Sequence, residues 1–207
     1  INSNFFGARN ELFITLTYRS NMTDNSRLRK DFDRFMKRFK YKYNNIKYIS
    51  VIEPQHRGSF HSHLLVKFLD LNNVFIENEI VAKMWGNGFV NVKSTYGIDN
   101  IGAYLTAYLT DIEVNVDDDL NNKNVVEKQI DGQSKKFIKG GRLHLYPSGM
   151  NYYRHSKNIS EPIQFFKEYG QIKKADLGKS TFKKSIIVKN DNFENAIHFE
   201  QYNSSQK

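Results

Sequence analysis

Two histidines separated by a single residue form the most reactive pattern in the sequence. His61 and His63 lie within residues 60–68, an apolar and aromatic run that is typical of a β-strand. Successive strand side chains point to opposite faces, so both imidazoles are expected on one face and the apolar residues on the other. Two imidazoles side by side can share a metal ion. Taken alone, such a pair is more often simply the polar surface of a strand.

Glu53 supplies an oxygen ligand for the same site. It ends a second predicted strand, residues 46–53, which a turn at residues 54–59 joins to the histidine strand in a hairpin. A carboxylate with two imidazoles suits Mn²⁺, Fe²⁺, Zn²⁺ or, less naturally, Mg²⁺, and leaves positions open for substrate oxygens. Open positions favour catalysis over a structural role. Gln55 and His56 in the turn are lower-ranked ligands, because a turn aims its side chains less firmly than a strand does.

Two tyrosines one helical turn apart offer a nucleophile. Tyr104 and Tyr108 lie in a helix predicted from residue 99 or 100 to about 111, and their spacing places both on one face of it. A phenol has a pKa of about 10, so attack by tyrosine needs a base or cation that favours phenolate, helped by a metal ion that polarises the target phosphate. The alternative is an aromatic stripe that packs on the sheet.

The other predicted elements indicate how these residues are positioned. Residues 12–18 alternate as a strand, and an amphipathic helix with a basic outer face follows the capping residues 23–25 and runs to Phe39. The order of elements predicts an α+β fold, with a central antiparallel sheet of about five strands and helices packed mainly on one face. The two remaining elements of this half are a helix from 72 or 73 to 85 and a strand at 89–93.

The second half of the chain carries weaker patterns. A polar insertion is expected around residues 112–135, and β character returns in residues 135–146. Further expectations are a short helix at 163–172, a pair of strands at 185–188 and 196–202, and a frayed polar end at 203–207.

Composition limits the classes of protein to which the chain can belong. Its 207 residues favour one domain, and a net charge of +9 favours polyanionic partners. The absence of cysteine excludes disulfides, cysteine zinc fingers, iron–sulfur clusters and a thiol nucleophile, and it favours a cytoplasmic location. No apolar run has the length of a transmembrane helix, and residues 1–10 lack the pattern of a secretory signal. No membrane partner is expected.

Three motifs, in this order along the chain, resemble those of the HUH endonucleases. Residues 13–18 resemble the first strand motif of that family, residues 53–65 its metal motif and residues 104–111 its paired-tyrosine motif. Within the family, the closest resemblance is to the rolling-circle replication initiators (Rep proteins) of small plasmids and single-stranded DNA phages. The resemblance implies a ferredoxin/RRM-like endonuclease domain over residues 1–155 and a C-terminal extension over 156–207 that packs on it.

The resemblance also implies an activity. Glu53, His61 and His63 would hold Mn²⁺ or Mg²⁺, and Tyr104 or Tyr108 would attack a phosphodiester of origin DNA, giving a 5′-phosphotyrosine and a free 3′-hydroxyl. Tyr104 is expected to make the first cut. The implied partners are single-stranded or hairpin origin DNA, with a host helicase and polymerase.

The sequence departs from the family pattern at a few positions. Ser62 stands between the histidines where the family has a hydrophobic residue, and Ala107 and Asp111 stand where lysines often follow the tyrosines. These departures keep open a non-catalytic, sequence-specific DNA-binding protein, beside a transposase or relaxase of the same chemistry. Expected DNA-binding residues are Arg57, Arg142 and Arg154, with Tyr152, Tyr153 and Trp85 as aromatic partners for bases.

Overall fold

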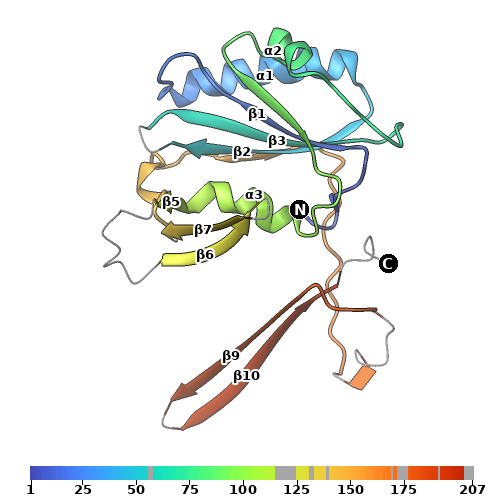
Figure 1. The fold of residues 1–207 in the computed structure, drawn as a ribbon, viewed down its shortest axis with the longest axis vertical. Coiled ribbons are helices and arrows are strands. Elements are labelled where there is room, and N and C mark those ends of the chain that lie inside the picture. Colours follow the sequence, from blue (N-terminus) through green and yellow to red (C-terminus); the bar gives the residue numbers. More distant parts are fainter. Residues whose placement is uncertain are drawn as a thin grey trace.

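The centre of the molecule is a five-stranded antiparallel sheet with the strand order β4-β1-β3-β2-β8 (Figure 1). Its strands are β1 (Glu11–Leu16), β2 (Ile46–Pro54), β3 (Phe60–Phe68), β4 (Val90–Ser94) and β8 (Tyr153–His155). This computed structural model describes residues 1–55, 58–114, 125–130, 133–138, 140–168, 170–171, 177–190 and 192–202. The predicted α+β fold with a central antiparallel sheet is confirmed.

The helices divide between the two faces of this sheet (Figure 1). Helices α1 (Asn25–Lys42) and α2 (Asn78–Trp85) cover one face, as expected, and α3 (Ile101–Thr110) lies alone on the other. The Asp24 side chain caps α1 by accepting hydrogen bonds from two backbone N–H groups of its first turn. The buried residues of α1 recur at helical spacing, and they are Leu28, Phe32, Phe35, Met36 and Phe39.

Strands β2 and β3 form the predicted hairpin. Their register pairs Glu53 with His61 and Val51 with His63. Gly58 allows the turn its left-handed backbone, with φ of 81°, and its N–H donates to the Gln55 carbonyl. His56 and Arg57 lie outside the described residues. The hairpin therefore brings the expected carboxylate and imidazoles to adjacent strands.

The fifth strand of the sheet is not where the sequence patterns indicated. Only part of residues 135–146 is a strand, and that strand belongs to a different sheet, while Leu143–Leu145 forms a single 3₁₀ turn. The edge of the central sheet is instead β8, which pairs with β2 through residues 49–51. A three-residue edge strand takes its conformation from its neighbour and has too short a pattern to be predicted.

The expected polar insertion contains strands. Strands β5 (Ile112–Val114), β6 (Val125–Ile130) and β7 (Gln133–Ile138) form an antiparallel sheet in the order β5-β7-β6. Glu127 and Lys136 are directly opposite each other in it, a pairing that favours this register. The most polar part of the insertion, residues 115–124, lies outside the described residues.

The C-terminal part ends in a hairpin that extends away from the central sheet (Figure 1). Strands β9 (Phe182–Asn190) and β10 (Phe193–Gln201) confirm the predicted strand pair. The short helix expected at 163–172 is not formed over residues 163–168; of the rest, 170 and 171 are helical, and 169 and 172 lie outside the described residues, as do 203–207. Among the described residues, no helix has the length and apolarity needed to cross a membrane.

Candidate active site

Glu53 and His63 form the centre of the candidate site. The Oε2 atom of Glu53 is in hydrogen-bond contact with Nε2 of His63, and both side chains are buried, with exposures of 8% and 4%. They come from neighbouring strands of the hairpin, on the sheet face that α3 covers. A buried carboxylate is stable only with hydrogen-bonding or ionic partners, so this contact helps to retain Glu53 in the interior.

The His63 ring is fixed from two sides. Its Nδ1 atom lies 3.1 Å from the Thr15 hydroxyl, which is its cross-strand neighbour on β1. The ring also stacks on Phe13, with centroids 5.3 Å apart and an interplanar angle of 20°. Both partners belong to the motif at residues 13–18. That motif therefore orients the imidazole.

Tyr104 reaches the same cluster from α3. Its ring meets the edge or face of Phe13 at a centroid distance of 5.2 Å and an angle of 78°. The Asn100 side chain caps α3 by accepting from the Ala103 N–H, and Asn2 accepts from the N–H of Gly102. Tyr108 follows one helical turn later, and its side chain is not among those that the structure describes. Phe13 thus lies between the histidine and the tyrosine that the sequence singled out.

The residues expected to hold a metal ion are brought near one another but are not closed into a cage. In the described ranges, no three His, Asp or Glu side chains are gathered closely enough to hold an ion. Glu53 touches His63, and half-buried His61 is the cross-strand neighbour of Glu53. One carboxylate and two imidazoles fit a divalent cation by their donor chemistry. To act as a ligand, Glu53 would exchange its contact with His63 for the ion.

Arg142 lies inside the site rather than on a DNA-facing surface. Its Nη1 is 2.6 Å from Oε1 of Glu53 and donates to the Pro54 carbonyl at 2.9 Å. Its Nε donates to the Asp111 carbonyl, at the end of α3, at 2.7 Å. The guanidinium therefore ties the end of β2 to the end of α3. Sequence reasoning found this residue but not this role, because no local pattern links positions 53 and 142.

Tyr146 makes a second link between the same two elements, and sequence reasoning missed it. Its hydroxyl is 2.8 Å from the carbonyl of Ile52 and 2.9 Å from that of Leu109. Burial raises the pKa of this phenol well above its usual value, and the negative charge of Glu53 raises it further. Tyr146 therefore stays protonated and acts as a hydrogen-bond donor. Its one signal in the sequence was an aromatic residue shortly after a pair of glycines.

The other expected DNA-binding residues are not brought to this site. Arg154 is on β8, where it pairs with Asp33 of α1 at 2.8 Å, on the opposite sheet face. Trp85 is buried in the core between the sheet and α1 and α2, and its Nε1 donates to the Thr17 carbonyl. Tyr152 and Tyr153 are exposed. Arg57 lies in the part of the turn that the structure does not describe.

Comparison with known proteins supports one family. Residues 11–113 match the model of a family of replication-associated proteins, described under the name Replication-associated protein ORF2. The comparisons with curated proteins and with solved structures gave no match. The matched range includes the β2–β3 hairpin and all of α3, whereas Arg142 and Tyr146 follow it. The segment that carries Glu53, the two histidines and the paired tyrosines is therefore similar to the replication-associated proteins of this family.

Proposed function

We propose that this protein is a rolling-circle replication initiator that nicks and rejoins single-stranded origin DNA through a tyrosine. One observation carries the proposal. Tyr104, Phe13, His63 and Glu53 form a continuous chain of contacts on one sheet face, within the segment that matches a replication-associated family. A plain aromatic stripe would not need a buried carboxylate–imidazole pair beside it.

The proposed reaction is a transesterification. The Tyr104 hydroxyl oxygen attacks the phosphorus atom of a phosphodiester, and the bond from phosphorus to the 3′-oxygen breaks. The products are a 5′-phosphotyrosine and a 3′-hydroxyl, which takes up a proton equivalent to the one that the phenol loses. No oxidant or nucleotide is consumed, and the reverse reaction rejoins the strand. A host helicase and polymerase would extend the free 3′-end.

We also propose that Glu53, His61 and His63 hold Mn²⁺ or Mg²⁺. Such an ion, when bound, polarises the target phosphate and neutralises developing charge. The residues of this chain then have separate tasks: Thr15 and Phe13 orient His63, and Arg142 keeps Glu53 directed into the site. Arg142 and Tyr146 also fix the end of the helix that carries the nucleophile.

A covalent-adduct assay tests the proposed reaction. The protein is incubated with labelled single-stranded oligonucleotides, with and without Mn²⁺, and resolved on a denaturing gel. A metal-dependent adduct is expected for the wild type and for Tyr108→Phe, but not for Tyr104→Phe, since phenylalanine keeps the ring and lacks the attacking oxygen. An adduct that is lost only in Tyr108→Phe would reverse the order of the two tyrosines. No adduct with any origin-derived strand would favour a non-catalytic DNA-binding protein.

Metal binding is tested apart from activity. Calorimetric titration with Mn²⁺ is expected to show one site in the wild type and no binding in His61→Ala/His63→Ala. A control variant, His155→Ala, changes an exposed histidine of β8 and should bind Mn²⁺ as the wild type does. Equal affinity in the double variant would exclude the proposed ligands.

A further inference from the structure

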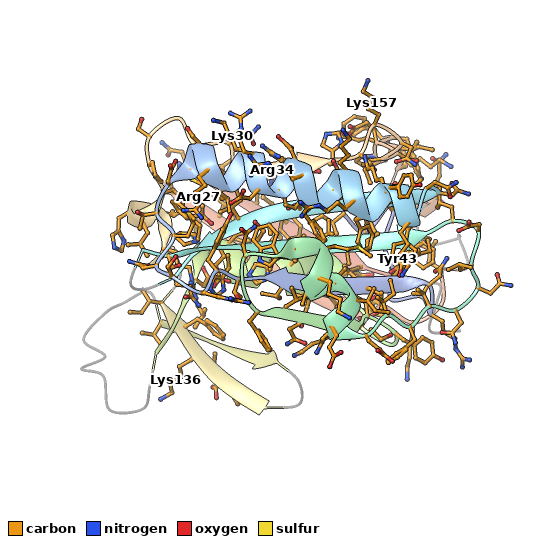
Figure 2. The ribbon with its side chains drawn as sticks, turned by 90° about the horizontal axis from the view of Figure 1, so that it is seen from above. Arg27, Lys30, Arg34, Tyr43, Lys136 and Lys157 are labelled. Atoms are coloured by element: carbon orange, nitrogen blue, oxygen red, sulfur yellow. The ribbon has the colours of Figure 1, made fainter. Side chains whose placement is uncertain are left out.

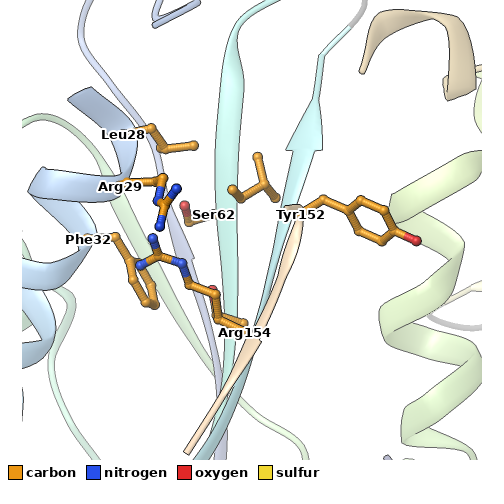
Figure 3. Close-up of a pocket in the computed structure, with 8 residues that line it drawn as sticks. Leu28, Arg29, Phe32, Ser62, Tyr152 and Arg154 are labelled. Atoms are coloured by element: carbon orange, nitrogen blue, oxygen red, sulfur yellow. The ribbon is translucent and has the colours of Figure 1, made fainter. Parts of the chain in front are cut away.

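A small pocket lies on the sheet face opposite to the candidate active site, between α1 and β8. Arg29 of α1 and Arg154 of β8 line it, and Figure 3 shows their guanidinium groups directed into the same space beside Ser62. The other residues that line it are Leu28, Phe32, Ser50, Ile52 and Tyr152. The pocket thus combines two cationic groups and two hydroxyl-bearing residues on a sheet face whose other inward side chains are mostly apolar.

The charges around the pocket are not balanced. Arg154 pairs with Asp33, but no described carboxylate lies within ion-pair distance of Arg29. Two guanidinium groups that share one space repel each other unless an anion lies between them. Ser62 is also the residue that replaces a hydrophobic side chain in the motif, and its side chain points to this pocket rather than to the histidine face. Both features favour an anionic ligand.

The size of the pocket selects the kind of anion. Its interior has room for about one water-sized group. A single non-bridging phosphate oxygen has that size, whereas a nucleotide base or a sugar does not fit. The remainder of the ligand must stay outside, as the backbone of a nucleic acid would.

The outer face of α1 continues the positive charge beyond the pocket. The helix carries eight basic and two acidic side chains, a net charge of +6 out of the +9 of the whole chain. Arg27, Lys30, Arg34 and Lys37 recur every three or four residues on its exposed side, and Figure 2 shows the first three on the outer surface. At 1.5 Å per residue the helix is about 27 Å long, a straight line of charge suited to a stiff duplex.

We propose that this α1 face, which comprises the Arg29–Arg154 pocket and the exposed basic side chains of α1, binds the phosphate backbone of duplex DNA. The inference rests on the proposed function in that it takes DNA as the polyanion. It adds a second surface, because the sheet separates α1 from Glu53, His63 and Tyr104. A duplex on α1 and a single strand at the site on α3 are therefore held at the same time.

The experiment measures duplex binding in protein that cannot cut. In a Tyr104→Phe background, fluorescence anisotropy follows a labelled duplex at increasing salt concentration. Arg29→Gln and Arg29→Gln/Arg154→Gln are compared with Lys184→Gln, which makes the same charge change on the exposed hairpin. We expect the log–log salt slope to fall by about one in the double variant, with about tenfold weaker binding, and to be unchanged in the control. Arg29 has an exposed side chain, so the single variant should fold normally.

A second measurement separates this inference from the proposed function. With Tyr104 intact, both arginine variants should form the covalent adduct on a short single strand as the wild type does. If no variant forms an adduct while duplex binding still depends on Arg29, the proposed nicking fails and the α1 surface stands. If the duplex affinity and salt slope of the double variant equal those of Lys184→Gln, the α1 surface is refuted, whatever the adduct assay gives.

Discussion

Replacing Tyr146 with phenylalanine tests whether the link between β2 and α3 positions the nucleophile. The substitution removes one oxygen atom and leaves the ring, including its contact with Tyr152 at 5.3 Å. It leaves the Ile52 and Leu109 carbonyls without the hydroxyl that lies between them. Leu109 is in the last turn of α3, where carbonyls have no partner within the helix.

The size of the effect follows from these two contacts. A buried carbonyl that loses its partner costs about 1–3 kcal/mol, and because Tyr146 is only partly buried, water compensates for part of the loss. We expect the free energy of unfolding to fall by about 1–2 kcal/mol. For a chain of this length that corresponds to a decrease in Tm of about 3–6 °C. The end of α3 is then less firmly held, and adduct formation should slow by about tenfold or more, since small misplacements of a nucleophile are costly.

Thermal unfolding and single-turnover adduct formation measure the two effects. Tyr152→Phe is the matched control, because this exposed tyrosine packs on the same ring and the described residues offer its hydroxyl no hydrogen bond. Mn²⁺ affinity should be the same in both variants. If Tyr146→Phe has the wild-type Tm and the wild-type rate, the link between β2 and α3 does not position the nucleophile, and the reasoning from the two carbonyls is wrong.

Three further predictions concern stability. Arg142→Gln removes the ionic partner of Glu53 and two bonds to backbone carbonyls, and should cost about 2–4 kcal/mol in urea denaturation, whereas Arg142→Lys should recover part of the loss; wild-type stability in Arg142→Gln would exclude a structural role for the ion pair. Burial raises the pKa of Tyr18 and Tyr146, so the folded state keeps these protons while the unfolded chain releases them near pH 10; Tm should therefore fall as the pH rises above about 10, and a constant Tm there would contradict this. A chain that ends at residue 168 lacks the exposed β9–β10 hairpin and should unfold within about 2 °C of the full chain in calorimetry; a large decrease would mean that the hairpin supports the central sheet.

The sequence predicted the parts of the site that depend on local periodicity. His61 and His63 share a face because strand side chains alternate, and Glu53 comes opposite His61 because a short turn fixes the register of a hairpin. Helical spacing likewise placed Tyr104 and Tyr108 one turn apart on α3. These relationships extend over at most about ten residues, so a pattern in one sequence is enough to find them.

The features that the sequence did not predict depend on distant contacts. Arg142 follows two glycines in a turn with no periodicity, and only the folded chain brings it to Glu53. Strand β8 has three residues and is defined by its pairing with β2. That α3 lies opposite α1 and α2 could not be read from its sequence either, because its residues are largely apolar on all sides.

The alternation along β3 has a consequence for how this protein can change. Phe60, Ser62 and Leu64 face α1, while His61 and His63 face α3. Substitutions at even-numbered positions of this strand alter one surface and leave the other intact, so holding DNA and cutting it can be altered independently, by natural selection or in the laboratory. An insertion or deletion of one residue has the opposite effect, since it exchanges the two faces and damages both at once. We therefore expect β3 to accept substitutions far more readily than changes in length.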